Sequence, residues 1–205
     1  MKVTKTGDWT AARRILASAP KRIREAQDKA VLQEAQFFRT KIVEGLRSGA
    51  PGGQAFQPLA PTTLAIRRLR GGKGTKPLIH HGDLRNSIAV VREGNGVFVG
   101  VLRSAKSSGG GSLVNIAAVH EFGSRPIVVK ITPKVRRFLH AAFRKAGLDE
   151  KSGDRPSTGV AVIRIPARPF LRPVFETYGA PEEVARRFVE RVAKLLGGDF
   201  GGPGG

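Results

Sequence analysis

Cysteine is absent from the 205 residues, so the chain has no disulfide framework, no thiol nucleophile and no cysteine-based zinc site. Apolar runs are short, and none approaches the ~20 residues of a membrane-spanning helix, so we expect no membrane partner. Acidic residues are also scarce: the 16 Asp and Glu are scattered along the chain. Metal-dependent nucleases need several carboxylates that converge on one point, and this distribution does not predict such a cluster.

Positive charge is the property in which the sequence departs most from an ordinary soluble protein. The 36 Lys and Arg give a formal net charge of +20 at pH 7. Such a field attracts polyanions, which include DNA and acidic protein surfaces. The sequence has one Trp and one Tyr, and most of its 11 Phe lie at apolar periodic positions typical of a core. Any DNA contact is therefore expected at phosphates and not at bases.

The hydrophobic pattern predicts an α+β fold, in which an antiparallel β-sheet is packed by a long N-terminal helix and a C-terminal helix, with flexible Gly-rich loops. A short helix is expected from Asp8 to Ser18, and Pro20 is placed in the first turn of a second helix that ends at Ser48. The second helix, on the order of 40 Å long, outreaches a small core, so part of it is expected to meet another subunit. The further expected helices lie at 62–70, 135–146 and 180–196, and the expected strands at 86–92, 97–102, 127–131 and 160–165.

The chain divides by composition into three parts. We expect an N-terminal arm at 1–19, a domain at 20–196, and a disordered Gly-rich tail at 197–205. Inside the domain, Gly-rich segments at 49–53, 70–74 and 104–112 are expected to be mobile.

One stretch organises the domain, from Val160 to Tyr178. It begins with β-branched residues that favour a strand, and prolines 166, 169 and 173 then form a stiff corner. Apolar side chains, Phe170 among them, fill that corner. It should therefore hold neighbouring elements or subunits at a fixed angle.

Three motifs carry a resemblance to a known family. They are KPLIHHGDLRNSIAV at 76–90, VHEFG at 119–123 and IPARPFLRPVF at 165–175. In this order they resemble the phage virion morphogenesis family, the tail-completion or neck proteins of tailed phages, of the Mu G protein type. The long segment from Lys134 to Gly159 separates the second motif from the third more widely than the compact family pattern does.

The resemblance implies a structural virion protein with no cofactor and the same α+β architecture. It implies a homo-oligomeric ring, expected to be a hexamer, at the head-proximal end of the tail. The ring would join the tail tube or terminator protein to the head connector, with genomic DNA passing through its bore. The protein would be assembled in the host cytoplasm and reside in the tail or neck of the virion. The residues expected at contacts are Gly82, Leu84, Ser87, His120, Glu121, Phe122, Gly123, Arg168, Pro169, Phe170, Leu171 and Arg172.

A basic run between the predicted helix at 62–70 and the first motif has two interpretations. It contains no acidic residue, and its cations are Arg67, Arg68, Arg70, Lys73 and Lys76. It is either an exposed, mobile arm or a contact with DNA phosphates or an acidic partner.

Motifs for catalysis are weak throughout the sequence. His80 and His81 would point to opposite faces of a strand, and His120-Glu121 lacks the second histidine of a zinc-protease motif. Ser87, His120 and Asp83 are the residue types of a Ser–His–Asp catalytic set, but nothing in the sequence brings them together. The G-x-S-x-G nucleophile elbow is also absent. The glycines match neither a P-loop nor a dinucleotide-binding turn. We therefore expect no enzyme, no metal and no cofactor.

Two alternatives to the ring protein stay open. The chain could be a basic DNA-binding accessory protein that contacts phosphates without forming a ring. The third, weaker alternative is an enzyme with a site assembled from scattered residues.

Overall fold

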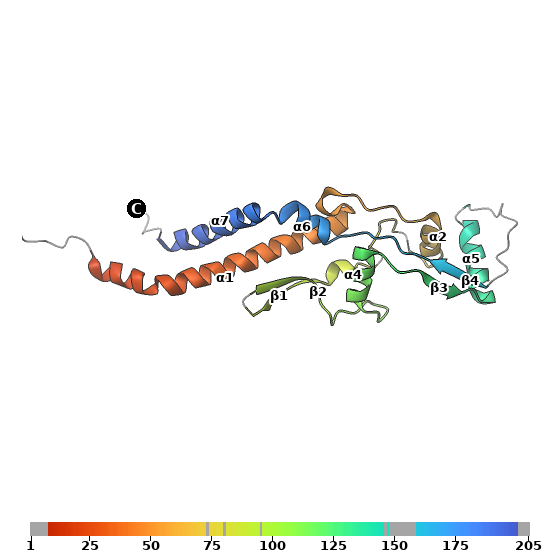
Figure 1. Ribbon diagram of the computed structural model, residues 1–205, viewed down its shortest axis with the longest axis horizontal. Coiled ribbons are helices and arrows are strands. Elements are labelled where there is room, and N and C mark those ends of the chain that lie inside the picture. The colour runs from red at the N-terminus through yellow and green to blue at the C-terminus, as the bar shows by residue number, and fades with distance from the viewer. Residues whose placement is uncertain are drawn as a thin grey trace, which may run out of the picture.

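The computed structural model describes residues 8–72, 74–79, 81–94, 96–145, 147 and 159–200, and the chain is strongly elongated (Figure 1). Its elements in chain order are α1 (Trp9–Ser48), η1 (Pro51–Gly53), α2 (Pro61–Leu69), α3 (Asp83–Asn86), β1 (Ile88–Glu93), β2 (Gly96–Val101), α4 (Leu113–Phe122), β3 (Ile127–Lys130), α5 (Pro133–Lys145), β4 (Val160–Ile163), α6 (Arg172–Tyr178) and α7 (Pro181–Phe200). The α+β class predicted from the sequence is confirmed. In the described part of the chain, no helix combines the length and the apolar character needed to cross a membrane.

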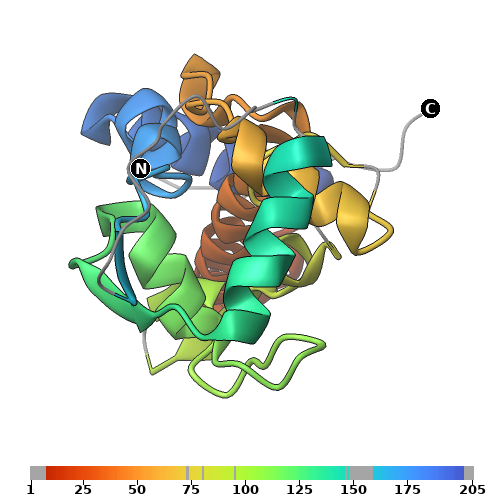
Figure 2. The ribbon, with the colours of Figure 1, turned by 90° about the vertical axis from the view of Figure 1, so that its right-hand side faces the viewer.

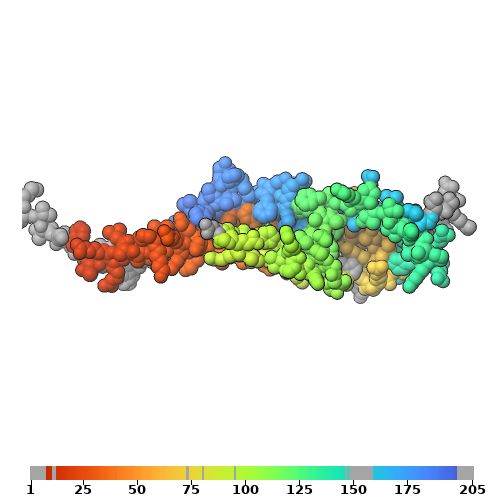
Figure 3. Space-filling view, turned by 60° about the horizontal axis from the view of Figure 1, so that its bottom comes forward, coloured from red at the N-terminus to blue at the C-terminus, as the bar shows by residue number. Residues whose placement is uncertain are grey.

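Helix α1 forms the backbone of the molecule. It runs for 40 residues without a break, so the expectation of two separate helices, one at 8–18 and one from Pro20, is wrong. Pro20 lies inside α1, where it is exposed. An interior proline costs a helix about 3 kcal/mol, and the apolar stripe that α1 buries further along offsets that cost. The first turns of α1 extend beyond the β1–β2 hairpin (Figure 3) and expose Leu16.

The strands form two separate antiparallel pairs, whereas the sequence suggested one sheet. Strands β1 and β2 pair from Ile88 opposite Val101 to Glu93 opposite Gly96, which confirms the predicted hairpin. Strands β3 and β4 pair with each other and with no other strand of the described chain. Pro166 and Pro169 lack the N–H of a ladder and follow β4 directly, so the chain leaves this pair towards α6.

Two Gly-rich segments expected to be mobile are held in place by contacts. Pro51 in η1 is buried, and the Thr177 hydroxyl of α6 donates to the carbonyl of Gly52. A Cβ on Gly52 would lie 2.3 Å from the Pro173 carbonyl oxygen, so this close approach requires glycine. The segment at 104–112 is closed by a bridge between Lys106 and Ser112. Glycine therefore serves here to permit tight turns.

The core lies where α1, α4, the β1–β2 hairpin and the corner before α6 meet. Its buried residues are Phe38, Ile42, Leu46, Leu84, Ile88, Val101, Leu113, Ala117, Phe170 and Val174. The stretch from Val160 to Tyr178 thus contributes its apolar corner to the centre of the fold.

The last helix is longer than predicted. Helix α7 continues to Phe200, past the expected start of the Gly-rich tail at Gly197. The remainder of that tail, 201–205, lies outside the described residues. Helix α7 packs along α1 and brings the C-terminal part of the chain back beside the long helix (Figure 1).

Candidate functional site at the junction of the three motifs

Glu121 connects the second motif to the third. It lies in the last turn of α4, and its carboxylate accepts the backbone N–H groups of Phe170 at 2.9 Å, Leu171 at 3.1 Å and Arg172 at 2.8 Å. The first N–H groups of a helix lack partners within the helix, and α6 has no acidic residue in its own first turn. The carboxylate of Glu121 therefore satisfies the start of α6 with charge-assisted bonds.

Arg168 fixes the extended part of the third motif. Its side chain is 7% exposed and donates from Nε to the Gln57 carbonyl at 2.9 Å and from Nη2 to the Pro58 carbonyl at 3.0 Å. Its backbone N–H donates to the His120 carbonyl at 2.6 Å. One buried guanidinium thus ties the third motif to the loop before α2 and to the end of α4.

Ser124 and Gly123 complete that attachment. The Ser124 backbone N–H donates to the Ile165 carbonyl, and the Ser124 hydroxyl oxygen accepts the Ile165 N–H at 2.8 Å. Gly123 has φ 83°, a left-handed conformation, and a Cβ there would lie 3.4 Å from the Ala167 nitrogen. The positive φ favours glycine at this position, where α4 ends beside the third motif.

The first motif forms a short helix, and its Asp83 and Ser87 side chains form hydrogen bonds with other groups of the chain. Gly82 precedes α3 with φ 83°, Leu84 is buried, and the Ser87 hydroxyl donates to the Leu84 carbonyl at 2.8 Å. Asp83 Oδ2 accepts the N–H and the hydroxyl of Ser108, each at 2.8 Å. The backbone N–H of Ser108, followed by its hydroxyl, holds the pKa of Asp83 below its ordinary value.

His120 is half-buried at the same junction. Burial, and then the positive charge of Arg168, hold the pKa of His120 below its ordinary value, so the neutral ring is favoured. Its Nδ1 is buried without a hydrogen-bond partner in the described part of the chain. Asp83 and Ser87 are bonded to other groups, and a Ser–His–Asp relay is therefore not formed among them. The described residues also contain no cluster of His, Asp and Glu that could hold a metal ion.

The three motifs meet around one groove of about 680 Å³. Leu78 and Leu84 line it from the first motif, His120 from the second, and Ile165 and Arg168 from the third. The sequence did not indicate that the three motifs line one groove, because the groove brings together residues that lie up to about ninety positions apart.

The expected contact residues differ in their access to solvent. Phe170 is fully buried, and Leu84 and Arg168 are nearly so. Phe122 is 81% exposed, Arg172 is exposed, and Pro169 and Leu171 are half-buried. An interface between chains can use the exposed side chains directly, whereas the buried ones can only support it from within.

The basic run is anchored at several points. Arg67 Nη1 donates to the carbonyls of Gly74 at 3.3 Å and Lys76 at 2.9 Å, and burial, then the charge of Arg168, lower the pKa of Arg67. Lys76 Nζ donates to the Arg47 carbonyl at 2.8 Å. These bonds argue against a freely mobile arm over this run. Arg68 is exposed, and Lys73 lies outside the described residues.

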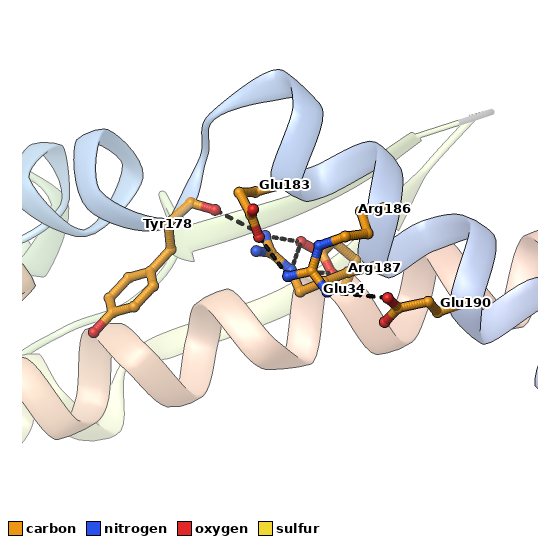
Figure 4. A network of polar contacts seen from close by, with 6 residues as sticks. All are labelled: Glu34, Tyr178, Glu183, Arg186, Arg187 and Glu190. Carbon is orange, nitrogen blue, oxygen red and sulfur yellow. Dashed lines mark hydrogen bonds and ion pairs between the residues drawn. The ribbon is translucent and has the colours of Figure 1, made fainter.

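Sequence reasoning missed a buried ion-pair cluster between α1 and α7 (Figure 4). Glu34 is 8% exposed, and its Oε1 lies 2.6 Å from Arg187 Nη2. Arg191 Nη1 forms a second ion pair with Glu34, and Arg187 also donates to the Tyr178 carbonyl at 2.8 Å. Two features of the sequence could have indicated this cluster. They are Arg187 and Arg191, four residues apart on α7, and Glu34, a single acid on the apolar side of α1.

Comparison with known proteins gives one match. No curated protein and no solved structure matches the chain significantly. The model of the phage virion morphogenesis family matches residues 8–196 and spans all three motifs, α1 and most of α7. A match over that extent, far more than half of the sequence, shows that the chain belongs to the phage virion morphogenesis family.

Proposed function

We propose that this chain is a neck or tail-completion component of a tailed phage, of the Mu G protein type, which forms a ring at the head-proximal end of the tail. Membership of the family gives the chain a structural or assembly role in the virion and points to a non-enzymatic function. The proposal adds the ring, expected to be a hexamer, and its neighbours, a tail tube or terminator protein and the head connector. Family membership over residues 8–196 is the observation that carries this proposal.

Exposed apolar residues on two unlike surfaces support the ring. One surface is the N-terminal part of α1, where Trp9 and Leu16 are exposed. The other comprises Phe122 and the β3–β4 pair, whose Val128 and Val162 are exposed. An isolated two-stranded ribbon is marginally stable in water, and contiguous exposed apolar surface is typical of an interaction site. Unlike surfaces that meet head to tail generate closed rings when the rotation between copies closes.

Native mass measurement tests the ring. We expect the full chain to give a closed oligomer, with six copies as the expected number, and Phe122→Ser to shift the population towards monomer. Val189→Ser is the matched control, because Val189 is 63% exposed on α7, away from that surface. A monomer at all concentrations would contradict the proposal, and so would equal oligomer loss in both variants. Labelling the chain in purified virions would test its place in the neck.

The alternative is a DNA-binding accessory protein that does not form a ring. The net charge of +20 favours it, since such a charge draws a chain to phosphates without any assembly. The same mass measurement separates the two functions. A chain that remains monomeric while it binds DNA would support the accessory protein in place of the ring component.

A further inference from the structure

One end of the molecule contains no acidic residue among its described positions. It is formed by the described residues of 61–79 with α2, 123–147 with β3 and α5, and 159–167 with β4. The described residues of these stretches carry four, seven and one Lys or Arg and no Asp or Glu. We call this region the basic end. Its cations are Arg67, Arg68, Arg70, Lys76, Arg125, Lys130, Lys134, Arg136, Arg137, Arg144, Lys145 and Arg164.

The carboxylates of the first and second motifs bind groups other than the basic-end cations. Asp83 accepts hydrogen bonds from Ser108, and Glu121 accepts three backbone N–H groups. Within the described residues, none of the basic-end cations forms an ion pair with a carboxylate. The sequence at 148–158, outside the described residues, contains three acidic and two basic residues and would remove one net charge.

Helix α5 carries five of the exposed cations of the basic end. Lys134, Arg136, Arg137, Arg144 and Lys145 are all exposed, while Ala142 is fully buried on the opposite side of the helix. Helix α5 packs beside α2 at this end of the molecule (Figure 2), and the Arg70 guanidinium lies 5.5 Å from the centre of the Phe138 ring. Two neighbouring helices thus present their positive charge on one end of the elongated fold.

The charge pattern favours a polymer of uniform negative charge as the partner. A surface of uniform positive potential complements a partner of uniform negative potential, and the phosphate backbone of DNA supplies such a potential along its whole length. Helix α5 is about 20 Å long, and duplex DNA carries one negative charge per ≈ 1.7 Å of its axis, so α5 can lie opposite several phosphates. Phe138 and Phe143 are half-buried, so they do not provide open platforms for bases.

We propose that the basic end binds the phosphate backbone of duplex DNA without reading its sequence, and that exposed cations of α5 make the principal contacts. The inference rests on the charges and burial of this end, and it holds for a ring and for a monomer alike. In a ring with DNA in its bore, the basic end would be the part of each copy that faces the DNA.

The test compares two adjacent arginine pairs in the full-length chain. The probe is a fluorescent duplex of mixed sequence, titrated at several salt concentrations. Arg136→Gln/Arg137→Gln removes two exposed charges from α5, and Arg13→Gln/Arg14→Gln removes two exposed charges from α1 at the other end. Both variants change the net charge equally. Each phosphate contact contributes about 0.9 to the slope of log K against log salt, so we expect the α5 variant to lose about two units of slope.

The expected loss of affinity for the α5 variant is roughly 10- to 100-fold at 0.1 M salt, with the α1 variant close to the original chain. A second duplex of unrelated sequence should bind with the same affinity. Equal losses in both variants would overturn the proposal, because net charge alone would then explain binding. Tighter binding to polyglutamate than to duplex DNA at the same salt would also overturn it and would indicate an acidic protein partner. Native mass spectra of the same samples report the oligomer separately, so failure of the ring is distinguishable from failure of DNA binding.

Discussion

The two ends of this elongated molecule hold their Lys and Arg residues in opposite circumstances. At the end formed by α1, α6 and α7, the described ion pairs join cations to carboxylates on the same or the neighbouring helix. At the basic end, the described cations have no carboxylate partner. In the first arrangement these cations form ion pairs within the fold, and in the second the described cations form none. The described residues of the basic end carry 12 Lys and Arg and no acidic residue, so this end holds more than half of the net charge of +20.

Within the paired end, burial separates two kinds of ion pair (Figure 4). Arg186 pairs with Glu183 and Glu190 on the outer side of α7, where all three side chains are more than half exposed. The pKa of Glu183 is lowered by its hydrogen bond from Arg186, yet water and salt screen such a pair strongly. Glu34 instead meets Arg187 in a nearly buried position between two helices. Of these two kinds of ion pair, the buried cluster is the one that joins α7 to α1.

The largest effect is expected at the junction between the two ends. Phe170→Ala removes a fully buried ring from the core, and such truncations cost about 3–5 kcal/mol. Val189→Ala, the control on α7, truncates a residue that is 63% exposed and should change stability by less than about 0.5 kcal/mol. Denaturant unfolding of both variants measures the difference. Similar unfolding free energies would show that the junction is not the centre of the fold.

The next largest effect is expected in the buried ion-pair cluster. Glu34→Gln leaves Arg187 and Arg191 without a carboxylate in a nearly buried position, which should cost about 3 kcal/mol. Glu25→Gln is the control, because the Lys21–Glu25 pair on the same helix is exposed. Thermal melts should show a clear loss for Glu34→Gln and almost none for Glu25→Gln. A loss that is equal in the two variants would remove the distinction between buried and exposed pairs.

A smaller, pH-dependent effect is expected at His120. Its pKa is lowered in the folded chain, so between that pKa and about 6.5 the unfolded chain binds more protons at this residue. The contribution of neutral His120 to stability is complete above about pH 6.5 and is lost as the pH falls from there towards the lowered pKa. Melting temperatures at about pH 7.5 and 5.5 should therefore differ less in His120→Gln than in the original chain. An unchanged difference in His120→Gln would exclude the titration of His120 as a source.

The smallest effect on stability is expected at the basic end. Arg68→Gln removes an exposed cation that has no ion-pair partner among the described residues, and should shift stability by less than about 0.5 kcal/mol. Arg67 is a poorer probe of this end, because its guanidinium donates to the carbonyls of Gly74 and Lys76. Equilibrium unfolding of Arg68→Gln measures the effect. Strong destabilisation would mean that the positive charge of this end supports the fold itself.

Local features of the fold could be predicted because their causes lie in neighbouring residues. The apolar spacing of Phe38, Ile42 and Leu46 predicted the buried stripe of α1, and the Gly-rich turn between β1 and β2 predicted their hairpin. The start of α5 also has a local cause, because the Thr132 hydroxyl oxygen accepts the Val135 N–H at 3.3 Å. The family resemblance was also available, since its motifs are contiguous runs of residues.

Other local predictions failed because tertiary contacts outweighed them. Pro20 and Gly197 are ordinary signals for a helix start and a helix end, yet α1 and α7 continue through them. Glycine at 49–53 suggested mobility, and packing against α6 instead uses it for close approach.

The sequence by itself determined the apolar stripe of α1, the β1–β2 hairpin, the net charge of +20 and the three motifs, since each follows from composition or from residues close together in the chain. Tertiary structure alone decided which partners those residues meet. It paired β3 with β4 across about thirty residues, brought Glu121 to the start of α6, and set Glu34 between two arginines of α7. It also gathered three acid-free stretches at one end. The physical reason is that long-range contacts are chosen by packing and by the pairing of buried polar groups, and neither leaves a regular period in the sequence.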